Sequence, residues 1–149
     1  MSWLKSMMEK EPPEPENPIG IVVIGNLEGD HVHQSAKEMV RKALKRAQFK
    51  AVDLGKGVST DVFASKAKEL NADIIALSIN TSPARDNLPK FFSVIKAAGL
   101  TDKVTVMIGG AAVDKEDADK ICAAYGETKE EAVALAKDAM ETRKLKANS

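Results

Sequence analysis

The chain has 149 residues, about the length of one domain and enough to bury a hydrophobic core. Its 22 basic residues balance its 22 acidic residues, which argues against a broad surface for nucleic acid or for an anionic membrane. Cys122 is the single cysteine, so no internal disulfide is expected, and neither a signal peptide nor a membrane-spanning run is evident. We therefore expect a cytoplasmic protein that binds neither nucleic acid nor membrane.

The first 18 residues differ in composition from the rest of the chain. Residues 11–18 contain four prolines and three glutamates, a composition that excludes a helix or a central strand. We predict a flexible Pro/Glu-rich arm over residues 1–18, a folded domain over 19–144 and a frayed tail over 145–149. The apolar residues around Trp3 leave two interpretations: a mobile terminus, or a segment that docks on a partner or on a second copy.

Strand and helix patterns alternate after the arm. Short β-branched runs predict strands at residues 19–25, 50–54, 72–78, 103–108 and 123–126. Apolar residues at helical spacing predict helices around residues 36–47, 63–70 (capped by Ser59 or Thr60), 88–95, 118–122 and 132–140. This alternation predicts an α/β, flavodoxin-like (Rossmann-like) doubly wound fold with a five-stranded parallel sheet in the order 2-1-3-4-5.

Such sheets bind ligands beyond the carboxyl ends of their strands, at the point where the strand order reverses. In the predicted order this point lies between strands 1 and 3. The loops that should meet there are residues 26–35, 79–85, 109–114 and 125–129.

Both histidines of the chain, His31 and His33, fall in the loop after the first strand, beside Asp30. Histidine is a good metal ligand, and a neighbouring carboxylate can fix its tautomer. Two solvated loop histidines are the alternative interpretation, and the residues alone favour neither. A third ligand for zinc is not evident, and the glycine spacings of a dinucleotide fingerprint or a P-loop are absent.

Two further loops carry small or polar residues. Ser-Ile-Asn-Thr-Ser-Pro at 78–83 indicates either turn chemistry with a helix cap or a hydroxyl and amide cluster for a ligand. Gly109 and Gly110 indicate either a tight turn or a place where a ligand lies against bare backbone. All of these signals converge on one edge of the predicted sheet.

The ordered motifs resemble the cobalamin (corrinoid)-binding domain family, and among its members the methyl-carrier proteins of methyltransferase systems. The resemblance spans about residues 19–140. The matching motifs are Ile-Gly-Asn-Leu-Glu-Gly-Asp at 24–30, Val-Asp-Leu-Gly at 52–55, Ala-Asp-Ile-Ile-Ala-Leu-Ser at 72–78 and Lys-Val-Thr-Val-Met-Ile-Gly-Gly at 103–110.

The hallmark of that family is Asp-x-His-x-x-Gly in the first loop, whose histidine is the lower axial ligand of cobalt and displaces the dimethylbenzimidazole base. Alignment on Lys37 makes His33 the implied ligand and Asp30 its partner, three residues before it instead of two. The extra residue should bulge outward near His31, and Ala36 replaces the final glycine. The remaining implied cofactor-binding residues, along the groove for the nucleotide tail, are Ser78, Asn80, Thr81, Gly109, Gly110, Tyr125, Gly126 and Thr128.

The resemblance implies a stand-alone cobalamin-binding protein that carries methyl groups for partner methyltransferases and has no catalytic residues of its own. The upper face of the corrin would be covered by a partner, by a second copy in a homodimer, or by neither. The altered hallmark motivates an alternative, in which the domain does not ligate cobalt and serves as a binding, regulatory or interaction module.

Overall fold

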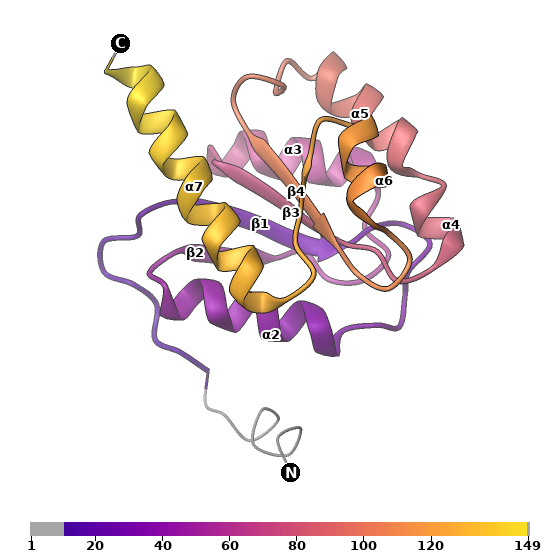
Figure 1. Cartoon of the computed structure of the whole chain (residues 1–149), viewed down its shortest axis with the longest axis horizontal. Coiled ribbons are helices and arrows are strands. Elements are labelled where there is room, and N and C mark those ends of the chain that lie inside the picture. Colours follow the sequence, from indigo (N-terminus) through magenta and orange to yellow (C-terminus); the bar gives the residue numbers. More distant parts are fainter. Residues whose placement is uncertain (1–10, 149) are drawn as a thin grey trace.

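The structure is a computed structural model, and it describes residues 11–148. Its five strands are parallel and lie in the order β2-β1-β3-β4-β5, which confirms the predicted fold (Figure 1). The elements in chain order are β1 (Ile21–Asn26), α2 (Ser35–Arg46), β2 (Lys50–Asp53), α3 (Thr60–Leu70), β3 (Ile74–Ser78), α4 (Ser82–Arg85), α5 (Leu88–Ala97), β4 (Thr105–Gly109), α6 (Lys115–Lys120), β5 (Ala124–Tyr125) and α7 (Lys129–Ala147).

Helices cover both faces of the sheet, with α2 and α7 on one face and α3 and α5 on the other (Figure 1). The interior strand β1, between β2 and β3, is buried from both sides, as its run of β-branched residues predicts. Val23 packs in the cluster that contains Phe63, whereas Val22 and Ile24 pack in the cluster that contains Leu44. This packing fixes the carboxyl end of β1 between β2 and β3.

The last helix is longer than the sequence pattern predicts. The apolar spacing ends at Met140, but α7 continues to Ala147, into the tail that was predicted to fray. Lys144 and Lys146 lie in its last turn, where positive charge interacts favourably with the helix dipole. Arg143 also pairs with Asp73 at 3.4 Å, so this part of the helix is held by charge rather than by apolar contacts.

The described part of the arm, residues 11–18, forms neither helix nor strand, as its prolines predict. It is nevertheless attached to α2 by charge. Glu11 pairs with Arg41 and, at 2.6 Å, with Lys45, and Glu14 lies 2.9 Å from Lys45. The interpretation of Trp3 concerns a residue outside the described range, and flexibility of the arm stays a prediction.

Attachment of the arm should depend on pH. Hydrogen bonds from Arg41 and then from Lys45 lower the pKa of Glu11 from its ordinary value of 4.5 to about 2. Because the folded pKa is the lower one, the stabilisation by ionised Glu11 is complete above 4.5 and disappears as the pH falls towards 2. Carbon-13 NMR of the Glu11 carboxyl should therefore show a midpoint near 2, and Arg41→Gln should raise it. An ordinary midpoint in the unmodified protein would show that the arm is detached.

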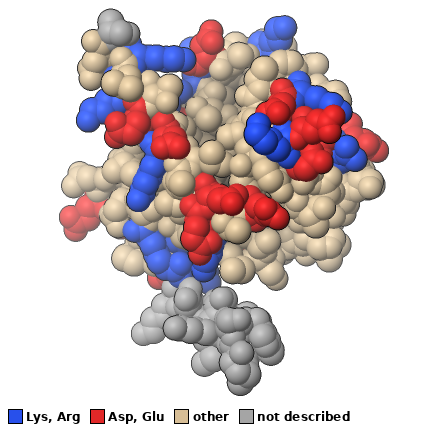
Figure 2. Space-filling model, in the orientation of Figure 1, with Lys and Arg blue, Asp and Glu red and all other residues tan. Residues whose placement is uncertain are grey.

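Positive and negative side chains are interspersed on the face shown in Figure 2, and no broad area of one sign is seen on it. Within residues 11–148, no helix combines the length and the hydropathy needed to cross a membrane.

Candidate cofactor site

The carboxyl ends of three strands lie side by side at the predicted ligand edge. The parallel register pairs Asn26 of β1 with Ser78 of β3, and Ser78 with Gly109 of β4. Asn26 and Gly109 are more than 80 residues apart in the sequence, yet they lie in one row, because the strands of a parallel sheet all end at the same edge. The loops predicted to carry the chemistry start from this row.

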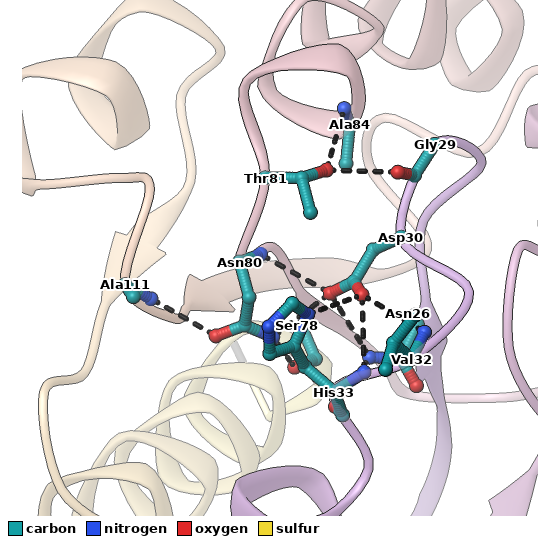
Figure 3. Close-up of polar contacts among 10 residues, drawn as sticks. All are labelled: Asn26, Gly29, Asp30, Val32, His33, Ser78, Asn80, Thr81, Ala84 and Ala111. Atoms are coloured by element: carbon teal, nitrogen blue, oxygen red, sulfur yellow. Dashed lines mark hydrogen bonds and ion pairs between the residues drawn. The ribbon is translucent and has the colours of Figure 1, made fainter.

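Asp30 is the centre of the polar contacts at this edge, and its side chain is fully buried (Figure 3). One carboxylate oxygen, Oδ1, lies 3.0 Å from Nδ1 of His33 and accepts hydrogen bonds from the backbone N–H groups of Val32 and His33, at 3.4 and 3.3 Å. The other, Oδ2, accepts from Nδ2 of Asn26 at 3.2 Å and from both N and Nδ2 of Asn80, at 3.2 and 2.9 Å. Asp30 is thus fully hydrogen-bonded.

These contacts determine the ionisation of Asp30 and the tautomer of the His33 ring. Burial opposes ionisation of Asp30, but hydrogen bonds from Asn80, His33 and Asn26 outweigh it and hold the pKa of the carboxyl well below its usual range. An ionised carboxylate only accepts hydrogen bonds, so Nδ1 of His33 carries a proton and the lone pair of a neutral ring is on Nε2. The His33 side chain is 54% exposed, so the ring is open to solvent or to a ligand. A carboxylate that orients an imidazole in this way is typical of metal-ligating histidines.

The extra residue of the loop bulges outward, as the sequence predicts. Val32 is 75% exposed, and the turn around Asp30 still brings His33 back to the carboxylate despite the longer spacing. His31 faces another segment: its ring lies against Gly57, where any added Cβ would collide with it. Of the two histidines, only His33 contacts Asp30 through its side chain within the described structure.

A cavity of about 880 Å³ lies between α2 and α7, over the ends of β1, β3 and β4. Its volume is within the range of sites for small molecules and cofactors. Seven of the residues implied by the family resemblance line it: Ser78, Asn80, Gly109, Gly110, Tyr125, Gly126 and Thr128. Asp30 and His33 do not line the cavity itself, but Asn80 lines it and contacts Asp30 directly.

Thr81 is not brought to this cavity. Its hydroxyl donates to the carbonyl of Gly29 at 2.8 Å and accepts from the backbone N–H of Ala84, which caps the short helix α4. Thr81 thus fastens the histidine loop to α4. This favours the turn-and-cap interpretation for the second half of the Ser-Ile-Asn-Thr-Ser-Pro motif.

Gly109 and Gly110 are needed by the protein backbone itself, in addition to any space that they leave for a ligand. An added Cβ at Gly109 would lie 2.6 Å from the carbonyl oxygen of Gly126. Gly110 has a φ of +125°, and an added Cβ there would collide with the backbone of Ile79. Both glycines line the cavity, but a larger residue at either position would first displace neighbouring loops.

Two buried polar residues of this edge were not predicted as site residues. Asn26 donates from Nδ2 to the carbonyl of His33 at 2.8 Å, and its Oδ1 is buried without a hydrogen-bond partner among residues 11–148. The ammonium of Lys37 is fully buried, 2.9 Å from Asp53 and 3.3 Å from the carbonyl of Gly55. An asparagine that ends an otherwise apolar strand was the available signal for Asn26, whereas the partners of Lys37 depend on the packing of α2 against β2.

A doubly wound parallel sheet that presents an oriented imidazole near a cavity, at the carboxyl ends of its strands, is a cofactor-binding domain. The donor set fits a corrinoid, because it offers one free imidazole nitrogen for cobalt and, next to it, a cavity for a nucleotide tail. The chain belongs to the B12 binding domain family, whose model matches residues 20–136.

Known proteins with related sequences and structures agree with this assignment. The chain is 40% identical over 134 residues to trimethylamine corrinoid protein 2 of Methanosarcina mazei, covering 89% of this chain and 61% of that protein. A cobalamin-binding protein from Desulfitobacterium hafniense matches with a TM-score of 0.76 and 26% identity, covering 80% of this chain and 58% of that one. The monomethylamine corrinoid protein of Methanosarcina barkeri matches with a TM-score of 0.75 and 25% identity, covering 79% of this chain and 57% of that one. The chain therefore spans about three-fifths of these proteins.

Proposed function

We propose that this chain binds a corrinoid, with cobalamin as the reference cofactor, and carries a methyl group for methyltransferase partners. The observation that supports this proposal most is the Asp30–His33 pair beside the cavity. The names of the relatives, trimethylamine and dimethylamine corrinoid proteins, support the methyl-transfer setting. When bound, the cobalt of the corrinoid would supply the chemistry by accepting a methyl group and passing it on.

The residues of the chain would bind and orient the cofactor. His33 would bind cobalt through Nε2, while Asp30 holds the ring by Nδ1. The cavity between α2 and α7 would hold the nucleotide tail of the cofactor. No residue of the chain is proposed to act as an acid, a base or a nucleophile.

A second candidate function is a corrinoid-binding or regulatory module in which the protein does not ligate cobalt. It is favoured by the exposed extra residue in the histidine loop and by Ala36, which lines the cavity in place of the family glycine. Cofactor binding would then rest on the tail cavity alone. The two candidates differ in whether a protein nitrogen is bound to cobalt.

Partners and location extend the same proposal. We propose a methyltransferase as the protein partner, since a solved neighbour is described as a methanol:cobalamin methyltransferase complex. A second copy of the chain that covers the upper corrin face stays a prediction. A cytoplasmic location is proposed from the single cysteine, Cys122.

Filling the mouth of the cavity should weaken cofactor binding. Ala36 is exposed at the first turn of α2 and lines the cavity, so Ala36→Leu adds volume there with little change to the core. We expect cobalamin binding to weaken roughly tenfold, because overpacking a formed site costs about 1–3 kcal/mol. Equilibrium dialysis measures the effect. Ala134→Leu, at an exposed position of α7 outside the cavity, is the matched control. Equal binding by both variants would place the tail elsewhere.

Transfer of an isotopically labelled methyl group tests whether the chain carries methyl groups. The corrinoid-loaded chain is reduced and incubated with an isotopically labelled methylamine and a methyltransferase of a trimethylamine or dimethylamine system. The proposal predicts label on the corrinoid of the chain, at a level that depends on the methyltransferase. Tight cofactor binding without any labelling would favour the regulatory module.

A further inference from the structure

A second cavity, of about 450 Å³, lies at the other end of β4 from the candidate cofactor site. We call it the amino-edge cavity, because it is lined by residues 104–106, where β4 begins, whereas residues 107–110, where β4 ends, line the cofactor cavity. No residue within 11–148 lines both cavities. Its volume is within the range of sites for small molecules, so it is a candidate for a second, separate site.

The amino-edge cavity lies beside an open part of the sheet. Strand β5 is short and pairs only with Met107 and Ile108 of β4. In the described structure, no strand lies beside Thr105 and Val106 on that side, and both residues line the cavity. Two open residues are fewer than a typical strand contains, which favours a small molecule over a peptide strand as the occupant.

The floor of the amino-edge cavity is apolar and belongs to the hydrophobic core. Phe91 and Ile95 of α5 and Ile121, which ends α6, are buried and line the cavity. An apolar body placed against these side chains would leave water, which is favourable in proportion to the area covered. The floor therefore suits an alkyl chain or an aromatic ring.

The rim of the amino-edge cavity is positively charged. Arg143 and Lys146, three residues apart near the end of α7, line it together with a single acidic residue, Asp102. Arg143 contacts Asp73 through Nε at 3.4 Å. Its guanidinium carries two further nitrogens, which act only as donors and match the two oxygens of a carboxylate. Two cations against one anion therefore favour an anionic head group.

We propose that the amino-edge cavity binds a small organic acid, whose carboxylate meets Arg143 and Lys146 while its apolar body lies against Phe91, Ile95 and Ile121. This inference goes beyond corrinoid binding and does not depend on it, because the two cavities are formed by different residues. The ligand would lie at the start of the strand whose other end carries Gly109.

The test uses the full chain with octanoate as the probe and 1-octanol as an uncharged analogue of equal chain length. We expect calorimetric titration to show one octanoate site, with 1-octanol bound roughly tenfold more weakly, which is about 1.4 kcal/mol. Cys122 is exposed, lines the amino-edge cavity and is the single cysteine of the chain, so it reports on this site alone. Octanoate should slow its reaction with iodoacetamide, a neutral reagent.

Arg143→Gln tests the charged rim. It should weaken octanoate binding about tenfold and leave 1-octanol binding nearly unchanged, because only the charge is lost. Asp73→Asn is the matched control, since it removes the ion pair that holds the end of α7 but keeps the cation of Arg143. Asparagine can still accept the hydrogen bond that Asp73 receives from the backbone N–H of Ile21. We expect Asp73→Asn to bind octanoate at least as tightly as the unmodified protein.

The location is tested by filling each cavity in turn. Thr142 is exposed on α7 and lines the amino-edge cavity, so Thr142→Trp should remove octanoate binding. Glu141→Trp, at the adjacent exposed position outside the cavity, should keep it. Ala36→Leu, which fills the cofactor cavity, should also keep it.

Several results would overturn the proposal. No saturable octanoate binding, or binding that leaves the reaction of Cys122 unchanged, would show that the amino-edge cavity is not the site. Equal affinities for octanoate and 1-octanol, or equal losses in Arg143→Gln and Asp73→Asn, would refute recognition of an anion by the rim. Loss of octanoate binding in Ala36→Leu would place the probe in the cofactor cavity.

Discussion

Replacing His33 by alanine is expected to remove the nitrogen ligand from bound cobalt, whereas His31→Ala should keep it. The two histidines are two residues apart, yet only His33 has its ring held by the buried carboxylate of Asp30, at 3.0 Å. The ring of His31 lies against Gly57, on the side of the loop after β2. With nitrogen-15 histidine in the protein, electron paramagnetic resonance of the cobalt(II) form distinguishes an axial histidine, which gives a doublet splitting, from the nitrogen-14 of the cofactor's own base, which gives a triplet.

Two other results would contradict the assignment of His33 as the cobalt ligand. If both variants and the unmodified protein bind cobalamin without nitrogen splitting, ligation by histidine is wrong and the module that holds its cofactor by the tail is favoured. If His31→Ala loses the splitting and His33→Ala keeps it, the ligand has been assigned to the wrong histidine.

Gly110→Ala is expected to be among the most destabilising single substitutions at the cofactor edge. Its φ of +125° is costly for any residue with a side chain, by about 1–3 kcal/mol, and its Cβ would also collide with the backbone of Ile79. Gly55→Ala is the matched control, because Gly55 has a φ of +103° but no atom within 4 Å of an added Cβ. Overpacking adds roughly another 1–3 kcal/mol, so Gly110→Ala should lose that much more free energy of unfolding than Gly55→Ala.

Urea denaturation of both variants measures the difference. Equal losses would show that the loop after β4 moves freely away from Ile79. The glycine would then be needed only for its backbone conformation, and a close approach of the cavity-lining loop to β3 would be refuted.

The sequence predicted the fold well because its signals were local and repeated. Runs of β-branched residues separated by helical stripes are enough for a parallel sheet, and topology rules then restrict the strand order. The apolar spacing did not indicate how far α7 extends, because Arg143 and the lysines of its last turn stabilise the helix end without apolar contacts, and fraying of residues 145–149 stays a prediction. The short helix α4, begun by the Thr81 cap, likewise has no apolar stripe.

The candidate site was predictable in position but only partly in its contacts. The strand ends and the Asp30–His33 pair followed from motif and topology. The roles of Asn80 and Asn26 did not, because they depend on which atoms face each other once three loops have packed. Thr81 was placed with the tail residues by its neighbours in sequence, whereas its hydroxyl is turned towards Gly29.

One measurement tests the account most directly: the absorption spectrum and elution of cobalamin mixed with the unmodified chain at neutral pH. We predict that one cobalamin elutes with each chain in gel filtration and that its spectrum shows the dimethylbenzimidazole base displaced from cobalt. The reason is that His33 and the cavity between α2 and α7 offer a site for the metal and a separate site for the tail. Cobalamin that elutes free of the protein, or that binds with its own base still on cobalt, would contradict the account.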